Sequence, residues 1–203
     1  MEVAKFKEFL NEEKKERTFC KVLIITDEPE EAKTFHTADR LKQEAEKLKL
    51  PFYLYKLSGG YVTFEDNVRR LHNKKDPKGF EITSDTVAII RGSITRKDSW
   101  MDIVSMLEKD GICVVNSRQC ISVCADKYRT YLRLADFGIT QPNTALITDP
   151  EKSKEAFEKL DTKYPIILKT LRGSKGVGVL FVDSPKGLDS IVQLIHKQDE
   201  DAD

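Results

Sequence analysis

The first half of the chain alternates short apolar runs with amphipathic segments. Two segments, 36–48 and 98–109, repeat apolar residues every three or four positions, which predicts helices with one buried face. Four apolar runs have the length of buried strands: 20–26, 52–57, 86–90 and 112–115. Buried strands that alternate with such helices are typical of a parallel sheet covered on both faces. The pattern therefore predicts an α/β domain over 20–115.

Two stretches of this half fit the pattern less well. Residues 1–19 precede the first strand and are charged, with a helix predicted over 1–17, so we expect an N-terminal helical arm there. Gly59 and Gly60 predict a turn. The segment 61–81 is polar with weak periodicity, and no element is predicted within it.

The pattern changes after Asn116. Residues 117–138 read as helix with a break near 125–126, where Asp126 can cap a second helix over 127–137. Further strands and helices are predicted in the order strand 145–147, helix 150–160, strand 165–171, strand 179–182 and helix 185–196. This order resembles an α+β unit with antiparallel pairing. We place a domain boundary near Asn116, which gives a second domain over 116–203.

A glycine-rich loop at 173–178 joins the last two predicted strands. Three glycines in six residues let backbone N–H groups approach an anion closely. A Walker A loop and a dinucleotide fingerprint both lead into a helix, whereas this loop leads into a strand. Lys169, in the strand before the loop, has apolar neighbours, so we expect it to be buried or half-buried and to need an anionic partner. A phosphate-binding flap and a mobile hairpin with a lysine at the sheet edge both remain open.

Composition excludes several other classes of protein. The 34 basic and 34 acidic side chains cancel, so the net basic charge typical of nucleic-acid binding is absent. No apolar run approaches the length of a membrane span, and the charged start has no signal-peptide core. Four scattered cysteines predict no disulfide framework. These features favour a cytoplasmic protein without membrane or nucleic-acid partners.

Cysteine and histidine residues offer no clear metal site. Cys120 and Cys124 share a helix face without a second ligand pair, so we expect them to pack in the core. The three histidines lie on unrelated elements and are expected at the surface. The acidic tail, 199–203, is interpreted as a loop rather than a metal site. No residue is assigned as a metal ligand, and the catalytic residues stay unknown.

The segment 116–144, together with the Lys169 strand and the glycine loop, resembles the ATP-grasp superfamily. Asp126-Lys127 would open a helix that leads to the Gly-Ile-x-x-Pro-x-Thr turn at 138–144, followed by the lysine strand and the glycine flap. The nearest relatives look like RimK-type α-L-glutamate ligases. Ile90-Arg91-Gly92 approximately fills the position of an earlier Arg-x-Gly element of that family. The resemblance is specific over 116–197 and general over 20–115, which would be a pre-ATP-grasp domain.

This resemblance implies a cofactor set and a group of binding residues. ATP and Mg²⁺ would turn a carboxylate into an acylphosphate, which an amine such as that of glutamate then attacks. The residues implied to contact ATP lie at the start of the second helix, in the lysine strand and in the flap: Lys127, Lys169, Gly173, Ser174, Gly176, Val177 and Gly178. Arg91, at the end of a buried strand, is a candidate for binding a substrate carboxylate.

The resemblance also implies that this chain is incomplete as an enzyme. ATP-grasp enzymes hold the nucleotide between two halves, and the chain ends after what would be the first half. The metal ligands and the acceptor grip are expected in the second half, from a C-terminal continuation or a partner chain. The acceptor could be a protein, a peptide or a small molecule. The alternative is a non-catalytic nucleotide-binding or protein-interaction module that retains the fold.

Overall fold

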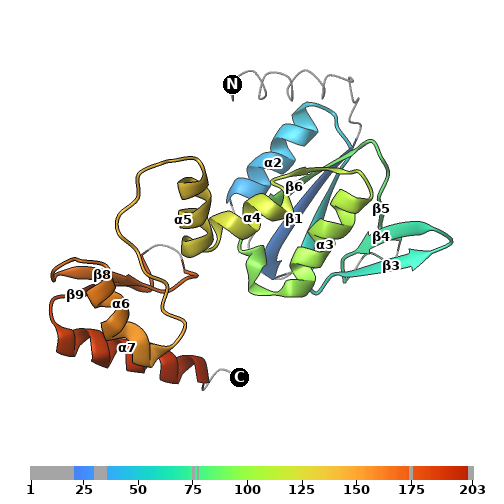
Figure 1. Ribbon diagram of the computed structural model, residues 1–203. Coiled ribbons are helices and arrows are strands. Elements are labelled where there is room, and N and C mark those ends of the chain that lie inside the picture. The colour runs from blue at the N-terminus through green and yellow to red at the C-terminus, as the bar shows by residue number, and fades with distance from the viewer. Residues whose placement is uncertain (1–20, 30–35, 75, 77, 174–175, 201–203) are drawn as a thin grey trace. The chain divides into compact units, whose positions relative to one another are not determined.

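The structure is a computed structural model that describes residues 21–29, 36–74, 76, 78–173 and 176–200. The predicted arm at 1–19 lies outside these residues. The chain divides into two compact units, 1–120 and 121–203, and each is considered by itself (Figure 1). The predicted boundary near Asn116 and the roles given to the two domains remain predictions.

The first unit is built on a parallel sheet of four strands. Its strands are β1 (Lys21–Pro29), β2 (Phe52–Ser58), β6 (Thr86–Arg91) and β7 (Cys113–Val115), in the order β2-β1-β6-β7. All three pairings are parallel, and β1 aligns Ile24 with Leu54 of β2 and with Ile89 of β6. The predicted α/β class with a parallel sheet is confirmed.

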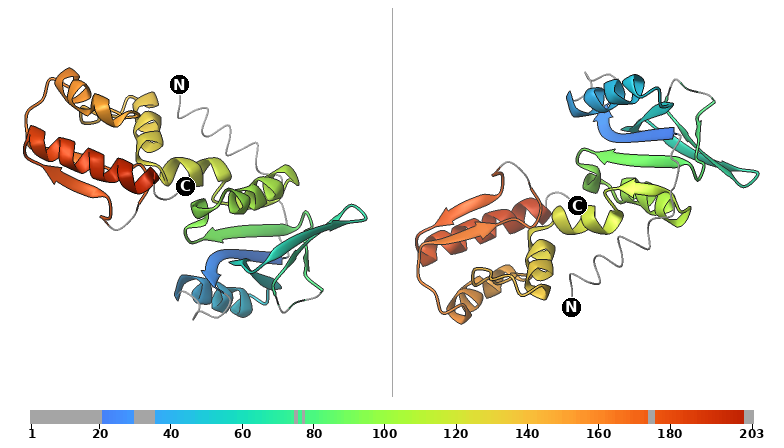
Figure 2. Two further views of the ribbon diagram at one scale, coloured as in Figure 1. Left: turned by 90° about the horizontal axis from the view of Figure 1, so that it is seen from below. Right: turned by 90° about the horizontal axis from the view of Figure 1, so that it is seen from above.

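Two helices cover this sheet, α2 (His36–Lys47) and α3 (Asp98–Lys109), and they lie on opposite faces (Figure 2). On one face, Val22 and Ile24 pack with Ala38 of α2. The buried side of α3 consists of Trp100, Met101, Val104 and Leu107. A short 3-10 helix, η1 (Ile94–Arg96), connects β6 to α3. Because both faces are covered, β1 is apolar and buried from Val22 to Ile25.

The segment without a predicted element forms a small antiparallel sheet. Its strands are β3 (Tyr61–Glu65), β4 (Val68–His72) and β5 (Phe80–Glu81). Asp66 and Asn67 both have positive φ, of 50° and 62°, and turn the chain between β3 and β4. That dipeptide, followed by alternating residues, is the signal in the sequence that could have revealed the hairpin.

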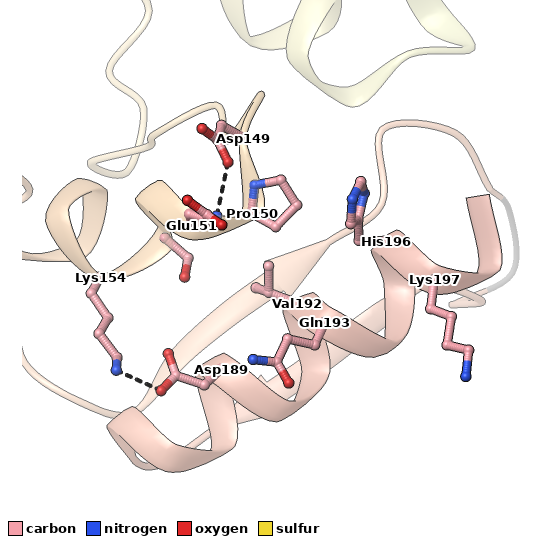
Figure 3. A pocket seen from close by; sticks show the side chains of 10 residues that line it. Asp149, Pro150, Glu151, Lys154, Asp189, Val192, Gln193, His196 and Lys197 are labelled. Carbon is pink, nitrogen blue, oxygen red and sulfur yellow. Dashed lines mark hydrogen bonds and ion pairs between the residues drawn. The ribbon is translucent and has the colours of Figure 1, made fainter. Parts of the chain in front are cut away.

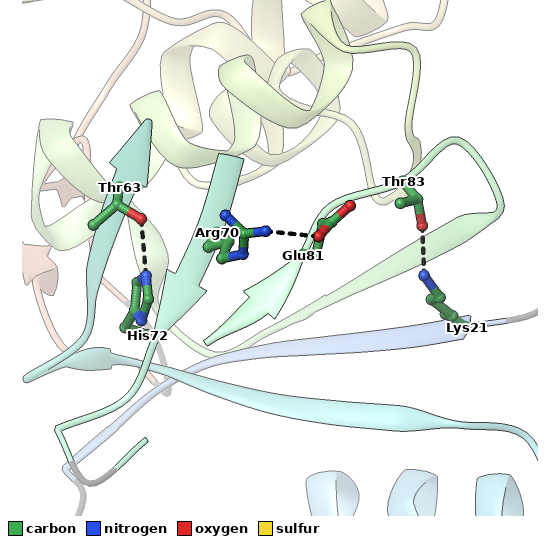
Figure 4. Close-up of polar contacts among 6 residues, drawn as sticks. All are labelled: Lys21, Thr63, Arg70, His72, Glu81 and Thr83. Carbon is green, nitrogen blue, oxygen red and sulfur yellow. Dashed lines mark hydrogen bonds and ion pairs between the residues drawn. The ribbon is translucent and has the colours of Figure 1, made fainter. Parts of the chain in front are cut away.

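The small sheet buries a histidine that was expected at the surface. His72 is 5% exposed, stacks on the Tyr61 ring with centroids 4.6 Å apart, and shares a 2.9 Å hydrogen bond between Nε2 and Thr63 Oγ1 (Figure 4). Arg70 pairs with Glu81 across the neighbouring strands at 2.9 Å. The surface prediction for His72 was wrong because the cross-strand neighbours that cover it were not foreseen.

The second unit packs helices on one face of a two-stranded antiparallel sheet, β8 (Ile166–Lys169) and β9 (Val179–Val182). Its helices are α5 (Lys127–Asp136), η2 (Pro150–Lys152), α6 (Ser153–Lys159) and α7 (Pro185–Glu200). Val182, Leu188 and Val192 form its buried core. The predicted strand at 145–147 does not form. A strand needs a neighbour for its backbone groups, and this segment pairs with no other strand of the described chain.

Helix α4 (Arg118–Cys124) spans the boundary of the two units. Cys120 and Cys124 are both exposed on it, which corrects the expectation that they pack in the core. The helix has seven residues and none of them is buried, so its apolar positions do not form a packed face. No helix in the described part of the chain is long and apolar enough to cross a membrane.

Candidate functional site

The site in the second unit starts at the N-terminus of α5. The Asp126 carboxylate accepts hydrogen bonds from the backbone N–H groups of Tyr128 at 3.0 Å and Arg129 at 2.9 Å. These bonds satisfy two of the N–H groups that a helix start leaves without intrahelical partners. Asp126 is 8% exposed, so the cap is largely shielded from water. The predicted cap is confirmed, and it fixes Lys127 as the first residue of the helix.

Lys127 bonds to the segment between β8 and the glycine loop through both its backbone and its side chain. Its backbone N–H donates to the Leu171 carbonyl at 2.9 Å, and its Nζ donates to the Thr170 carbonyl at 2.9 Å. One neutral carbonyl leaves the ammonium with two further N–H donors. The side chain is therefore held in place while its charge stays available for an anion.

The glycine loop is closed at its base by Thr170. The Thr170 N–H donates to the Gly178 carbonyl at 2.8 Å, and its hydroxyl donates to the Arg172 carbonyl at 2.7 Å. Gly178 has a φ of +73°, and a Cβ there would lie 2.1 Å from Thr170 Oγ1. Glycine is therefore required at 178 both for its backbone conformation and for the room that it leaves Thr170.

The loop and Lys127 come together at Gly173. This residue has a φ of +138°, and a Cβ placed on it would lie 3.7 Å from Lys127 Nζ. Gly176 has a φ of +81° with open space around it, and Val177 is 72% exposed. The structure thus brings Lys127, Gly173 and Gly178 to one end of the hairpin. Ser174 lies outside the described residues.

Lys169 lies at the end of β8, opposite Val179 of β9. It is exposed, which corrects the expectation of a buried or half-buried lysine. The strand alternates, so Ile166 and Leu168 pack against the helices while Ile167 and Lys169 face outward. Ile167 and Leu168, the apolar neighbours of Lys169 in the sequence, did not indicate that Lys169 is buried, because they lie on opposite faces of the strand.

The outward face of this hairpin is mostly apolar. Ile167 is 53% exposed and lies opposite Phe181, which is 66% exposed, and Val179 is 42% exposed. Contiguous exposed apolar surface on a protein marks an interaction site for a ligand or another chain. Lys169 lies on the same face, beside the glycine loop. The face therefore combines an apolar surface with a cation at one end.

Thr170 is the residue of this site that sequence reasoning missed. It donates from its backbone and its hydroxyl, and its carbonyl receives the Lys127 ammonium. A threonine that directly follows the lysine strand, three residues before the glycine loop, was the available signal. The sequence alone could not show that one residue bonds three separate segments.

The described residues offer no metal centre. No three His, Cys, Asp or Glu side chains among them converge in a way that could hold an ion. An open pocket of about 630 Å³ lies between η2, α6 and α7, and it contains none of the predicted binding residues (Figure 3). Three of its charged side chains have partners: Lys154 pairs with Asp189 at 2.7 Å, and Asp149 accepts from the Glu151 N–H at 2.9 Å. The first contact joins α6 to α7, and the second caps η2.

The remaining candidate, Arg91, belongs to the first unit. It ends β6, where it aligns with Thr26 of β1, and its side chain is exposed. Its position at the carboxyl end of a parallel strand agrees with the reasoning that selected it.

Comparison with known proteins agrees with this geometry. Residues 124–199 match the RimK-like ATP-grasp domain model. A probable α-L-glutamate ligase of Teredinibacter turnerae is 30% identical over 91 residues, which cover 45% of this chain and 30% of that protein. The N-acetylaspartylglutamate synthase A of Mus musculus is 32% identical over 112 residues, which cover 54% of this chain and 30% of that protein. These matches thus span about a third of each relative's length.

A solved structure extends the similarity to both units. The RimK domain ATP-grasp protein of Sphaerobacter thermophilus superposes with a TM-score of 0.60 at 19% identity, over 88% of this chain and 59% of that one. At this identity the match concerns the fold. The family model covers the capped helix α5, the lysine strand and the glycine loop together. Over residues 124–199, the chain is thus similar to the RimK-like ATP-grasp domain.

Proposed function

We propose that the chain supplies the ATP-binding part of an ATP-dependent carboxylate–amine ligase, with the nucleotide phosphates held at the glycine loop of the second unit. The observation that carries the proposal is the position of Lys127. Its ammonium is fixed by the Thr170 carbonyl and lies beside Gly173, where a phosphate on the loop would meet it. A cation beside a loop with accessible backbone N–H groups is a chemically suitable phosphate site.

The other residues predicted to bind ATP would enlarge this site. Lys169 would provide a second cation for the phosphates from the exposed face of β8. On the same face, Ile167 and Phe181 would lie against the flat purine base, which is the apolar part of ATP. Gly176, Gly178 and Val177 would form the flap, and Ser174 is retained from the sequence prediction.

The reaction follows from the class of ligase named among the relatives. An oxygen of the substrate carboxylate attacks the γ-phosphorus of ATP, and ADP leaves. The amine then attacks the acyl carbon, and phosphate leaves with the electron pair of the broken C–O bond. Lys127 and Lys169 would stabilise the negative charge that moves between phosphate oxygens. Mg²⁺ accompanies ATP in this chemistry, but the described residues provide no set of ligands for it, so no metal ligand is proposed here.

Nucleotide binding by the full chain tests the site. Titration with a fluorescent ATP analogue should give saturable binding that ATP displaces better than AMP, because the cations contact the terminal phosphates. Lys127→Ala and Lys169→Ala should each weaken this binding about tenfold or more, the loss expected from removing a charge-assisted hydrogen bond. The matched control is Lys159→Ala, an exposed lysine of α6 in the same unit.

Two results would contradict the proposal. Equal displacement by ATP and AMP would mean that the terminal phosphates are not held by these lysines. Wild-type affinity in both Lys127→Ala and Lys169→Ala would place the nucleotide elsewhere. Circular dichroism of each variant shows whether it is folded before its affinity is compared.

A further inference from the structure

The open pocket of the second unit is a candidate site apart from the glycine loop. It lies between η2, α6 and α7, and its volume of about 630 Å³ falls within the roughly 300–1,000 Å³ of small-molecule sites (Figure 3). None of the residues assigned to the nucleotide lines it. Pro150 and Val192 give its wall an apolar part, and the other lining side chains are polar. The pocket therefore has the size and the mixed lining of a site for a small polar molecule.

One hydroxyl group on the pocket wall is buried without a partner. Ser153, the first residue of α6, is 4% exposed and lines the pocket. Its hydroxyl makes no hydrogen bond with another described residue, whereas its backbone N–H donates to the Pro150 carbonyl. Buried polar side chains generally have a partner, from the protein or from ordered water. Ser153 therefore offers a donor and an acceptor to a molecule in the pocket.

Three further polar side chains on the wall are available to a ligand. Glu151 of η2 and both Gln193 and Lys197 of α7 make no side-chain hydrogen bond or ion pair within the described part of the chain. In Figure 3, Glu151 extends from one wall of the pocket and Gln193 from the other. A carboxylate accepts hydrogen bonds, an ammonium donates them and a carboxamide does both. The pocket therefore presents donors and acceptors from two walls.

The charges of the lining side chains nearly balance. Three of these side chains are carboxylates and two are lysines: Asp149, Glu151, Asp189, Lys154 and Lys197. Lys154 and Asp189 already neutralise each other at 2.7 Å, and His196 adds an imidazole. An anionic ligand would meet the Glu151 carboxylate, and a cationic ligand would meet the Lys197 ammonium. The lining therefore disfavours ligands with charge of one sign and favours a neutral one.

We propose that this pocket binds a neutral polyhydroxylated small molecule of the sugar or polyol class. The hydroxyls of such a ligand can donate to the Glu151 carboxylate and accept from Lys197 and Ser153. Its C–H surface would lie against Pro150 and Val192, which removes apolar surface from water. This inference does not depend on the proposed nucleotide site, which uses other residues of the unit.

The test is an NMR titration of the isotope-labelled full chain with three neutral polyols, namely D-glucose, maltose and myo-inositol. At least one of them should shift the amides at 149–154 and 189–197 in a saturable way. Putrescine is a cation, succinate is an anion and trimethylglycine carries both charges, and none of the three has a hydroxyl group. Each should bind at least tenfold more weakly than the best polyol.

Two variants remove one hydrogen-bonding group each. Ser153→Ala and Gln193→Met should each weaken binding of the best polyol about three- to tenfold, the loss expected for one neutral hydrogen bond. Ser153→Ala should keep the wild-type midpoint of urea unfolding, because its hydroxyl has no hydrogen bond to lose within the described chain. Ser190→Ala, at an exposed serine of α7 that does not line the pocket, is the matched control.

Three results would overturn the inference. Absence of saturable shifts with all three polyols would show that the pocket takes no ligand of this class. Tighter binding of putrescine, succinate or trimethylglycine would make the pocket a site for ions. Wild-type polyol affinity in both Ser153→Ala and Gln193→Met would place the polyol elsewhere. The probe series uses the wild-type chain, so it decides the question even where a variant is unstable.

Discussion

At the scale of single residues, the site in the second unit depends on contacts that composition does not reveal. The sequence predicted the glycines and both lysines as binding residues, because glycine spacing and charge are visible in a single chain. It did not identify Thr170, whose backbone and hydroxyl join β8, the loop and Lys127. It also misjudged the burial of Lys169, since the face on which a strand residue lies depends on which side the helices cover.

The glycines of the loop should differ in their tolerance to alanine. Gly176 and Gly178 share a positive φ, which costs an alanine roughly 1–2 kcal/mol. At 178 the added methyl group also meets Thr170 Oγ1, so overpacking adds about 1–3 kcal/mol. Urea unfolding should therefore show Gly178→Ala to be the more destabilised variant. Combining it with Thr170→Ala should recover part of the difference, and equal destabilisation of both alanine variants would contradict this account.

Two tyrosines of β2 should ionise at a higher pH than an ordinary tyrosine. Desolvation raises the pKa of Tyr55 to about 12, and desolvation together with the hydrogen bond to Asp76 raises that of Tyr53 to about 12. Below pH 10 these tyrosines are neutral in both the folded and the unfolded state, and their contribution to folding stability is complete. Between pH 10 and about 12 they ionise more readily in the unfolded state, so the free energy of unfolding falls. Ultraviolet absorbance at alkaline pH should show a late ionisation step, and Tyr53→Phe and Tyr55→Phe should each reduce its amplitude.

The same hydrogen bond should make stability depend on pH in the acid range, through the carboxyl of Asp76. The Tyr53 hydroxyl lowers the pKa of Asp76 below its usual 3.8. A lowered pKa means that this stabilisation is present above about pH 4 and is lost as pH falls through the folded value. Acid unfolding followed by circular dichroism should begin at a similar pH in Asp76→Asn, which removes the titrating carboxyl, and in Tyr53→Phe, which removes the hydroxyl that lowers its pKa. Markedly different onsets would show that the two groups act separately.

At the scale of elements, the sequence predicted correctly the features that depend on residues close together in the chain. The cap of α5 by Asp126 followed from residue type and position alone. The strands of the parallel sheet followed from their length and continuous apolar character. The sequence predicted no element where the β3–β5 sheet lies, and it predicted a strand at 145–147 that does not form. Both predictions failed because strand pairing depends on neighbours distant in the sequence.

Removing the cap should weaken both the helix and the nucleotide site. Asp126→Ala leaves the N–H groups of Tyr128 and Arg129 without their acceptor, which should cost about 0.5–2 kcal/mol of stability. It should also weaken binding of the ATP analogue, since α5 positions Lys127. Asp126→Asn keeps an acceptor oxygen and should retain most of both properties. Wild-type stability in Asp126→Ala would show that the cap contributes nothing measurable.

At the scale of the whole molecule, the two units differ in how well their sheets are covered. The first has four strands between helices, whereas the second has two strands with one face exposed. The sequence predicted two domains, because strand–helix alternation stops near Asn116. The structure divides the chain a few residues later, within α4. A boundary inside a helix leaves no break in hydrophobic pattern for sequence reasoning to detect.

The difference in coverage should appear as a difference in local stability. Backbone amides of β1 and β6 lie in the interior of a sheet and should exchange slowly with deuterium. Amides of β8 and β9 should exchange faster, because a two-stranded sheet is marginal by itself. Hydrogen–deuterium exchange with peptide mass analysis measures both in one sample. Slower exchange in the β8–β9 hairpin would mean that its exposed face is covered in solution.

The open hairpin has a consequence for how the isolated chain behaves at high concentration. β8 and β9 pair only with each other in the described part of the chain, so each has an outer edge of backbone groups open to a further strand. Beside these edges lie Ile167 and Phe181, which favour stacking of sheets from different molecules. Storage of the concentrated chain should therefore produce intermolecular β-sheet and turbidity. Phe181→Glu should delay that aggregation, and light scattering over days would measure it.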